Sequence, residues 1–341
     1  MKSKKILGLL LVITLLSASV FGSINVFAAS GDTHVALESY MPPVKTLFVD
    51  DDFQNRAVDE VVSNQPTGGQ YTHPISAAGN GIKAEKNDES DTNIYAKYNT
   101  GYQTIEYISD NLSNVENLAV SFKAVIPASG NSIRLRFGSS YPAFLFQRLS
   151  DGKIQTKIYT SASANTVITN KVTGELTDWF NVDIILKKGS NDNIQVKEIR
   201  INNEKQENTN VTMELYSGCN WRSAKNVGIQ STAINVKVDD ILIYEPQTVY
   251  FKDVTQTGLT IVNDSSEPVT GNLFLALYDT DGNLLTANPY GSDVTVAAGE
   301  SQTITAPTGI TYPTGVAKAK IFYWNGTTLA PLCYSADVPL S

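Results

Sequence analysis

The stretch LAVSFKAVIPASGNSIRLRFGSSYPAFLFQRLSDGKIQTKIY at residues 118–159 decides the fold class of this chain. Apolar and polar residues alternate through four short runs within it, at residues 118–126, 132–137, 143–148 and 154–159. A period of two places neighbouring side chains on opposite faces of a β-strand. Gly, Asn, Asp and Ser lie between the runs and favour tight turns. The stretch therefore predicts consecutive antiparallel strands.

The same pattern continues on both sides of this stretch. Further alternating runs occupy residues 179–186, 194–201 and 236–244, again separated by turn-forming residues. Only residues 55–63 are expected to form a short helix, which the PTGG sequence at residues 66–69 would end. We predict an all-β protein of antiparallel sheets. A doubly wound nucleotide-binding fold is excluded, because that fold places helices between its strands.

The first residues resemble an export signal. Three lysines within the first five residues precede an apolar run at residues 6–16, and Val26-Phe27-Ala28 fits a signal peptidase site. The run is shorter than the roughly 20 residues that a membrane-spanning helix needs. We therefore expect a secreted, extracellular protein without a transmembrane anchor, with a signal peptide at residues 1–28 and a polar leader at residues 29–45.

Charge and cysteine content narrow the function classes. The chain has 341 residues with 26 Lys and Arg against 34 Asp and Glu, a net charge of -8. Cleavage after Ala28 would remove three lysines, leaving 26 - 3 = 23 basic residues against 34 acidic ones, or -11. Nucleic acid is an unfavourable partner, because binding to its backbone depends on clustered Lys and Arg. Cys219 and Cys333 are expected to be free thiols in different domains rather than a disulfide.

A domain boundary is predicted at Glu245-Pro246-Gln247, where proline ends a strand and begins a connection. The 46–246 segment has the size of a jelly-roll β-sandwich, and the 247–341 segment has the size of an immunoglobulin-like β-sandwich. We expect two all-β domains.

Three motifs of the larger segment resemble a known family. It opens with FVDDDF at residues 48–53, continues with DWFNV at residues 178–182 and closes with VDDILIY at residues 238–244. This order is similar to the concanavalin A-like (laminin G-like) jelly-roll domains of secreted bacterial polysaccharide-active proteins. The resemblance implies that the opening and closing strands are neighbours in one sandwich.

The C-terminal segment also resembles a known type of module. FLALYD at residues 274–279 and KAKIFYW at residues 318–324 are similar to strands of the immunoglobulin- or fibronectin-III-like modules that end many secreted proteins of Gram-positive bacteria. That resemblance implies a spacer or accessory role without chemistry of its own.

Neighbouring opening and closing strands would gather Asp50, Asp52, Asp239 and Asp240. Carboxylates held close together repel one another unless a cation or water relieves them, and Ca²⁺ prefers such oxygen ligands. We therefore predict a structural calcium site at these residues. The alternative is that strand alternation sends the carboxylates to different faces, where water solvates them.

The sequence offers little for catalysis. Catalytic jelly rolls with paired carboxyls carry a Glu-x-Asp-x-x-Glu strand, and this chain has none. Its two histidines are His34 and His73, and no nucleophile elbow or zinc motif occurs. A polysaccharide lyase using Arg134, Arg136, Tyr141 and His73, or a glycoside hydrolase without a familiar motif, stays open as an alternative. An adhesive or structural surface protein is the other alternative.

A glycan-binding groove is the main functional prediction. Such grooves combine aromatic faces with Asn, Asp, Arg and Gln hydrogen bonds. The candidate residues are Arg134, Arg136, Tyr141, Trp221 and Arg222. Trp221 lies in the loop-like SGCNWRS sequence and is either a sugar platform or a plug packed on the sandwich, whereas Trp179 and Trp324 are expected in cores. We predict a secreted, monomeric, non-catalytic protein that binds polysaccharide or cell-surface glycan.

Overall fold

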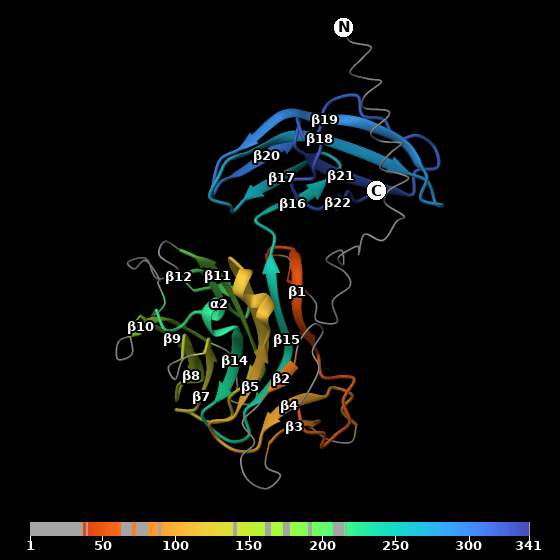
Figure 1. The fold of residues 1–341 in the computed structure, drawn as a ribbon. Helices are drawn as coiled ribbons and strands as arrows, with labels where there is room; N and C mark the ends of the chain where they lie inside the picture. The colour runs from red at the N-terminus through yellow and green to blue at the C-terminus, as the bar shows by residue number, and fades with distance from the viewer. Residues whose placement is uncertain are drawn as a thin grey trace.

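The computed structural model confirms the all-β fold class, with four antiparallel sheets (Figure 1). It describes residues 37–38, 40–62, 70–72, 81–87, 90–138, 142–160, 165–172, 178–189, 193–206, 215 and 217–340. The predicted signal peptide, both histidines and Tyr141 lie outside these residues. Within them, no helix is long and apolar enough to cross a membrane.

An eight-stranded sheet forms one layer of the larger sandwich. It contains β1 (Val44–Asp51), β3 (Ile82–Glu85), β4 (Tyr95–Tyr98), β6 (Asn117–Val125), β11 (Phe180–Lys188), β12 (Ile194–Ile201), β13 (Glu204–Lys205) and β15 (Lys237–Pro246). The strand order is β13-β12-β11-β6-β15-β4-β3, with β1 also paired to β15. Strands distant in sequence are therefore direct neighbours.

A seven-stranded sheet forms the second layer. It contains β2 (Gln70–Thr72), β5 (Thr104–Ile108), β7 (Ser132–Arg136), β8 (Phe144–Arg148), β9 (Lys153–Tyr159), β10 (Asn165–Val172) and β14 (Asn226–Ser231). The order is β10-β9-β8-β7-β14-β5-β2. The four runs of residues 118–159 thus form β6, β7, β8 and β9, and β6 lies in the opposite sheet from the other three.

One continuous core fills the space between these two sheets. Phe122 from β6 meets Phe146 from β8 with ring centroids 6.0 Å apart. The Tyr98 hydroxyl of β4 donates a hydrogen bond to the carbonyl of Ile229 in β14 at 2.7 Å. The inward positions are those that alternation predicts, so burial of apolar side chains holds the two layers together.

The opening and closing strands of this sandwich are neighbours, as the resemblance implied. β1 pairs antiparallel with β15, with Asp50 opposite Leu242 and Asp51 opposite Ile241. The residues before β1 also contribute packing, because Leu37, Tyr40 and Met41 belong to an apolar cluster with Tyr244. The described part of the predicted leader therefore packs against β15.

The expected helix at residues 55–63 is wrong. The described part of this segment consists of turns, and Val61 forms an isolated bridge with Lys83 at the edge of β3. Asp59 has a φ of 70° and its amide donates to the carbonyl of Ala84. The left-handed backbone at Asp59 breaks a helix, and pairing with β3 supplies the hydrogen bonds that a helix would have made.

Residues 249–337 form two smaller sheets, drawn at the top of Figure 1. The three-stranded sheet has the order β16 (Val249–Thr255), β17 (Gly258–Asn263) and β20 (Ser301–Thr305). The four-stranded sheet has the order β19 (Leu284–Val296), β18 (Val269–Tyr278), β21 (Lys318–Trp324) and β22 (Ala336–Asp337). A separate apolar core, including Leu273, Leu275, Ile321 and Tyr323, lies between them.

Two short helices among the described residues belong to the larger sandwich. The 3-10 helix η1 spans Asp110–Asn114, and α2 spans Trp221–Ala224. The Asn220 side chain caps α2 by accepting a hydrogen bond from the Arg222 amide. α2 directly precedes β14 and contacts η1, which follows β5.

Candidate functional site

Arg134 and Arg136 stand on the outer face of the seven-stranded sheet. Their neighbours Ile133 and Leu135 are fully buried in the core, so alternation along β7 turns both arginines away from it. Both arginines are half-buried. The predicted pair is therefore brought together on one surface.

The register of five strands extends this surface into two rows of side chains. Residues directly opposite each other in an antiparallel pair point to the same face. The first row runs through Thr104, Gln230, Arg134, Leu145 and Lys157, and the second through Glu106, Gly228 and Arg136. We call the polar members of these rows, Thr104, Glu106, Arg134, Arg136, Lys157 and Gln230, the arginine face.

Gly228 is the one position of the second row that carries no side chain. It lies between Glu106 and Arg136 in the register. A Cβ atom at this position would lie 3.0 Å from Cγ2 of Thr104, 3.8 Å from Cβ of Arg136 and 3.9 Å from Cγ of Glu106. A side chain here would press against Thr104, so close packing of the neighbouring strands favours glycine at this position.

Hydrogen bonds hold two side-chain amides at this surface, those of Gln230 and Asn226. The Gln230 side chain is only 8% exposed although it faces outward, and its Nε2 donates to Oγ1 of Thr104 at 3.1 Å. Nδ2 of Asn226 donates to Oε1 of Glu106 at 2.7 Å. These contacts reduce the rotamer freedom of this surface, which favours a preformed site.

Arg134 combines an aromatic contact with an unused donor. Its guanidinium lies over the ring of Tyr102, 5.7 Å from the centroid, and Tyr102 is 63% exposed. Nε of Arg134 is buried and finds no hydrogen-bond partner in the part of the chain that the structure describes. A buried donor in this state favours an acceptor from a ligand or from water.

The arginine face has a local excess of positive charge in a chain with a net charge of -8. Its two rows carry Arg134, Arg136 and Lys157 against one carboxyl, that of Glu106. Burial raises the pKa of Glu106, and the nearby Arg136 opposes that shift. Glu106 is therefore easier to protonate than an exposed glutamate, which would further increase the positive charge.

Trp221 does not belong to this surface, so its interpretation as a sugar platform is wrong. Its side chain is fully buried, packs edge-on against Phe137 at 5.7 Å and donates from Nε1 to the carbonyl of Val115 at 3.3 Å. The alternative interpretation, a plug packed on the sandwich, describes it correctly. Arg222 is also committed elsewhere, because its Nε donates to the carbonyl of Ser113 at 3.1 Å and so joins α2 to η1.

Sequence reasoning missed four members of the arginine face, namely Thr104, Glu106, Lys157 and Gln230, and also the adjacent Tyr102. Their own segments give one weak signal, an aromatic residue after Gly101 in a turn before an alternating run. What brings them beside Arg134 is the pairing of β14 with both β5 and β7. That pairing joins segments about a hundred residues apart and has no local sequence signature.

The predicted metal ligands have mixed environments. Asp240 forms an ion pair with Lys123 at 2.5 Å, and Oδ2 of Asp239 accepts from Nδ2 of Asn93 at 2.8 Å. Burial raises the pKa of Asp239 to about 7. Asp50 is buried on β1. Among the described residues, no group of three or more His, Cys, Asp or Glu side chains is arranged to hold a metal ion, so calcium stays a prediction.

Other oxygen atoms do converge near Asp52. Nε2 of Gln54 donates to the carbonyls of Asp52 and Ile94, at 2.8 and 3.0 Å, and to Oδ1 of Asn93 at 2.9 Å. Carbonyl and amide oxygens are ligands that Ca²⁺ accepts alongside carboxylates. A calcium ion at this point would have to displace the Gln54 amide.

The expectation that Trp179 and Trp324 lie in cores is also wrong. Trp179 precedes β11, is half-buried and contacts the Tyr95 ring edge-on at 5.6 Å. Trp324 ends β21 and is half-buried on the side opposite Ile321 and Tyr323. Alternation in these strands was recognised correctly, but its phase places the smaller Ile321 inside and Trp324 outside.

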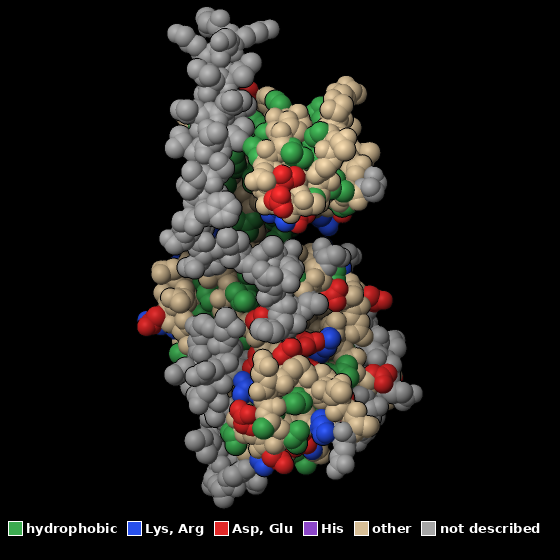
Figure 2. Space-filling view, turned by 90° about the vertical axis from the view of Figure 1, so that its right-hand side faces the viewer, with side chains coloured by type: hydrophobic (Ala, Val, Ile, Leu, Met, Phe, Trp, Pro, Cys, Tyr) green, Lys and Arg blue, Asp and Glu red, His purple; other side chains and the backbone are tan. Residues whose placement is uncertain are grey.

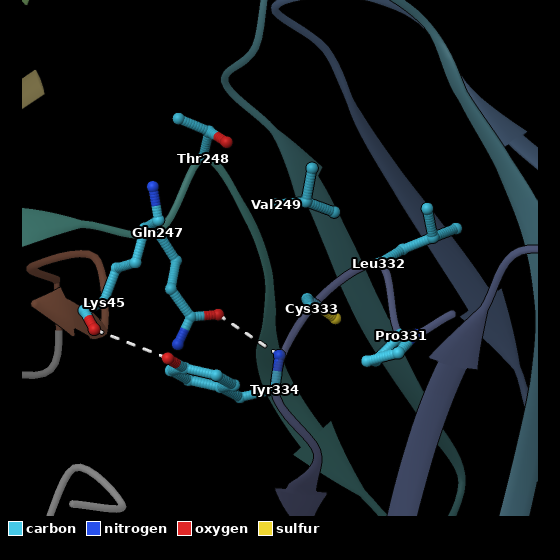
Figure 3. A pocket seen from close by; sticks show the side chains of 8 residues that line it. All are labelled: Lys45, Gln247, Thr248, Val249, Pro331, Leu332, Cys333 and Tyr334. Atoms are coloured by element: carbon cyan, nitrogen blue, oxygen red, sulfur yellow. Dashed lines mark hydrogen bonds between the residues drawn. The ribbon is translucent and has the colours of Figure 1, made fainter. Parts of the chain in front are cut away.

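A hollow of about 210 Å³ lies where the N-terminal and C-terminal parts meet (Figure 3). The Tyr334 hydroxyl donates to the carbonyl of Lys45, and the Tyr334 amide donates to Oε1 of Gln247, both at 3.4 Å. The half-buried Cys333 also lines it, and burial raises the pKa of its thiol. Its polar groups join the parts, and we assign the hollow a structural role.

Comparisons with known proteins give partial similarities. No family model matches the chain, and no curated protein matches it. Domain 4 of AbnA, an extracellular GH43 arabinanase from Geobacillus stearothermophilus, solved with arabinotriose, has a TM-score of 0.37 and 12% identity and covers 59% of this chain and 93% of its own. A botulinum neurotoxin type C structure, titled for its interaction with two ganglioside molecules, has a TM-score of 0.37 and 9% identity, with coverages of 82% and 85%. Sheep galectin-11 has a TM-score of 0.26 and 13% identity, with coverages of 41% and 96%. None of these similarities is close enough to assign a family.

Proposed function

We propose that this chain is a carbohydrate-binding protein and that the arginine face binds glycans carrying carboxylate or sulfate groups. The observation that supports this most directly is the register that places Arg134, Arg136 and Gln230 on one sheet face beside Gly228. A guanidinium offers a planar fork of donors that matches an anionic oxygen pair. Gln230 and Thr104 can hydrogen-bond sugar hydroxyls, and the exposed Tyr102 ring can contact the apolar face of a sugar.

We propose that the protein binds glycan without cleaving it. Glycoside hydrolases of the usual type use two carboxyl groups, about 5 to 9.5 Å apart, on either side of the scissile bond. Within the two described rows, Glu106 is the single carboxyl. A lyase is the competing function, since Tyr102 beside Arg134 could accept a proton next to a bound carboxylate.

We further propose that the protein acts outside the cell as a secreted monomer and that its glycan is a polysaccharide or part of a cell surface. The predicted signal peptide supports export, and a calcium ion near Asp52 and Asp239 would stabilise the strand pair β1 and β15. Export, the monomeric state and calcium binding are all proposals about the full chain in solution.

Affinity electrophoresis tests the binding proposal. The purified mature chain is run through gels containing an acidic polysaccharide, such as polygalacturonate, alginate or heparin, or a neutral one. We expect retardation by at least one acidic polymer, weakened at least tenfold in the Arg134→Gln/Arg136→Gln variant, because one lost charge-assisted hydrogen bond is worth roughly 1.5–3 kcal/mol and about 1.4 kcal/mol is tenfold in affinity. Arg222→Gln is the matched control, since Arg222 lies in the same sandwich but is held by Ser113.

Two outcomes would overturn the assignment. Equal retardation of the wild type and the double arginine variant would remove the arginine face from glycan binding. Release of unsaturated products, followed by ultraviolet absorbance and abolished in Tyr102→Phe, would replace binding by lyase activity.

A further inference from the structure

The outer face of the four-stranded sheet carries a row of aromatic side chains. Phe274 of β18 lies opposite Phe322 of β21 on one side and Pro289 of β19 on the other. The Trp324 ring contacts both phenylalanine rings, with centroids 5.6 Å apart in each case. We call Phe274, Pro289, Phe322 and Trp324 the aromatic face.

These rings are not part of the core between the sheets. The alternating neighbours Leu273, Leu275, Ile321 and Tyr323 are buried there, whereas the three rings are half-buried and Pro289 is exposed. A solvated face of an antiparallel sheet ordinarily carries polar side chains. The aromatic face therefore departs from what stability alone would require.

The other sheet of the same sandwich provides an internal comparison. Its outward positions include Lys252, Thr260 and Thr303, and the two threonine hydroxyl oxygens lie 3.3 Å apart across strands β17 and β20. Tyr250 and Val262 form one apolar pair at an end of that face, and the other paired positions are polar. A row of three contacting aromatic rings occurs on only one of the two outer faces, which indicates a binding function rather than a general property of this sandwich.

The chemistry of the aromatic face favours an uncharged, ring-shaped ligand. Its four residues carry no charge, and the neighbouring Lys318 and Lys320 both lie 3.8 Å from the carboxylate of Asp337. In the view of Figure 2, the visible side of the C-terminal part carries mainly uncharged side chains, with charged ones near its lower edge. Thr270 and Thr295 add paired hydroxyls at one end of the row.

We infer that the aromatic face is a second carbohydrate-contact surface, which binds an uncharged stretch of a polysaccharide through the apolar faces of its sugar rings. Neighbouring strands lie about 4.8 Å apart, so the row repeats apolar groups at a spacing comparable to one sugar ring. A stable protein interface needs roughly 800 Å² and 20–30 residues from each partner, far more than these four side chains. The surface has the extent of a glycan-binding strip instead.

Pull-down and affinity electrophoresis with neutral polysaccharides, namely cellulose, xylan and a β-1,3-glucan, test this inference on the full mature chain. The experiments are run in about 0.5 M salt, where screening suppresses the charge-driven arginine face. We expect binding to at least one of them, weakened at least fivefold in Trp324→Ala and in Phe322→Ala. Tyr312→Ala is the control, because Tyr312 is an exposed aromatic residue of the same part outside the aromatic face.

The outcomes separate this inference from the arginine-face proposal. Arg134→Gln/Arg136→Gln should keep its binding to neutral polysaccharide, and Trp324→Ala should keep its binding to acidic polysaccharide at low salt. Unchanged binding in both aromatic variants, or no binding to any of the three polymers, would overturn the inference. A dimer in analytical ultracentrifugation that Trp324→Ala converts to monomer would also overturn it, by showing a second copy of the chain as the occupant.

Discussion

The arginine face and the aromatic face occupy equivalent places in two sandwiches of different size. Each is the outward surface of an antiparallel sheet, and each lies behind inward aliphatic residues, Leu135 of β7 in one case and Ile321 of β21 in the other. The inward residues of both sheets are aliphatic, whereas the outward residues are arginine in one sheet and phenylalanine or tryptophan in the other. The sandwich therefore fixes which positions face outward and leaves their chemistry free for function.

The two faces also differ in the force that would drive binding. Charge attraction at the arginine face weakens with salt, whereas burial of ring surface at the aromatic face does not depend on charge. Two surfaces of this kind on one chain could engage different stretches of one heterogeneous polysaccharide. Linked binding of that type raises overall affinity when both surfaces can be occupied together.

The largest expected effect separates a buried tryptophan from an exposed one. Trp221→Ala should lower the free energy of unfolding by about 3–5 kcal/mol, because it leaves a cavity against Phe137. Trp324→Ala should lower it by less than about 1 kcal/mol, since its ring lies outside the core. Urea unfolding followed by circular dichroism measures both. Similar losses in the two variants would contradict the assignment of Trp324 to a binding surface.

The next effect concerns salt. The affinity of the wild type for a sulfated glycan should fall at least tenfold between about 0.05 and 0.5 M salt, and the Arg134→Gln/Arg136→Gln variant should show a much smaller fall. Isothermal titration calorimetry measures the slopes. The affinity for a neutral polysaccharide should change little over the same range. A shared salt dependence would show that the two faces do not act through different forces.

Much of the frame could be predicted from sequence, because alternation is a local signal. The runs at residues 132–137 and 194–201 became β7 (Ser132–Arg136) and β12 (Ile194–Ile201) almost residue for residue. The outward direction of Arg134 and Arg136 followed from the same alternation. The resemblance to concanavalin A-like jelly rolls implied that β1 and β15 are neighbours, and the structure confirms that pairing.

The composition of the sites could not be predicted in the same way. Alternation shows that neighbouring residues of a strand face opposite sides, but it does not show which side is the core. In KAKIFYW both sets of alternate residues contain large apolar side chains, which is why Trp324 was wrongly expected in the core. The loop around Trp221 gave no sign that Val115 and Phe137 would cover it. Gln230 and Glu106 reach Arg134 and Arg136 only through non-local register. Packing phase and register are tertiary properties.

The outward surface of the eight-stranded sheet is a third one to compare, and it carries the buried carboxyl of Asp239. Burial raises the pKa of this carboxyl from 3.8 to about 7, so the stability it contributes is present below about pH 4 and is lost as the pH rises through 7. Asp239→Asn should therefore be more stable than the wild type near pH 8, by up to about 4 kcal/mol for a shift of this size, and nearly equal near pH 4. Thermal unfolding at the two pH values measures this.

The Asp239→Asn variant also tests whether calcium binds at this surface. If the predicted ion binds near Asp52 and Asp239, then Ca²⁺ should raise the melting temperature of the wild type near pH 8 by mass action. Asp239→Asn should respond less, because it lacks the carboxylate. A melting temperature that is the same in Ca²⁺ and in chelator would remove calcium from this surface and leave the Gln54 amide as its natural occupant.

The smallest expected effect is a pH response confined to the arginine face. Burial raises the pKa of Glu106, so lowering the pH neutralises this carboxyl before ordinary exposed ones and removes a negative charge near Arg136. A sulfated glycan keeps its charge, so its affinity should rise about two- to threefold between about pH 7.5 and pH 5. Glu106→Gln should bind at pH 7.5 at least as tightly as the wild type does at pH 5, and it should lose the pH dependence. A neutral polysaccharide on the aromatic face should show no change, since that face has no carboxyl among its four residues. If Glu106→Gln kept the full pH response, the titrating group would lie elsewhere, and the pairing of acid and arginine across Gly228 would not be what tunes this surface.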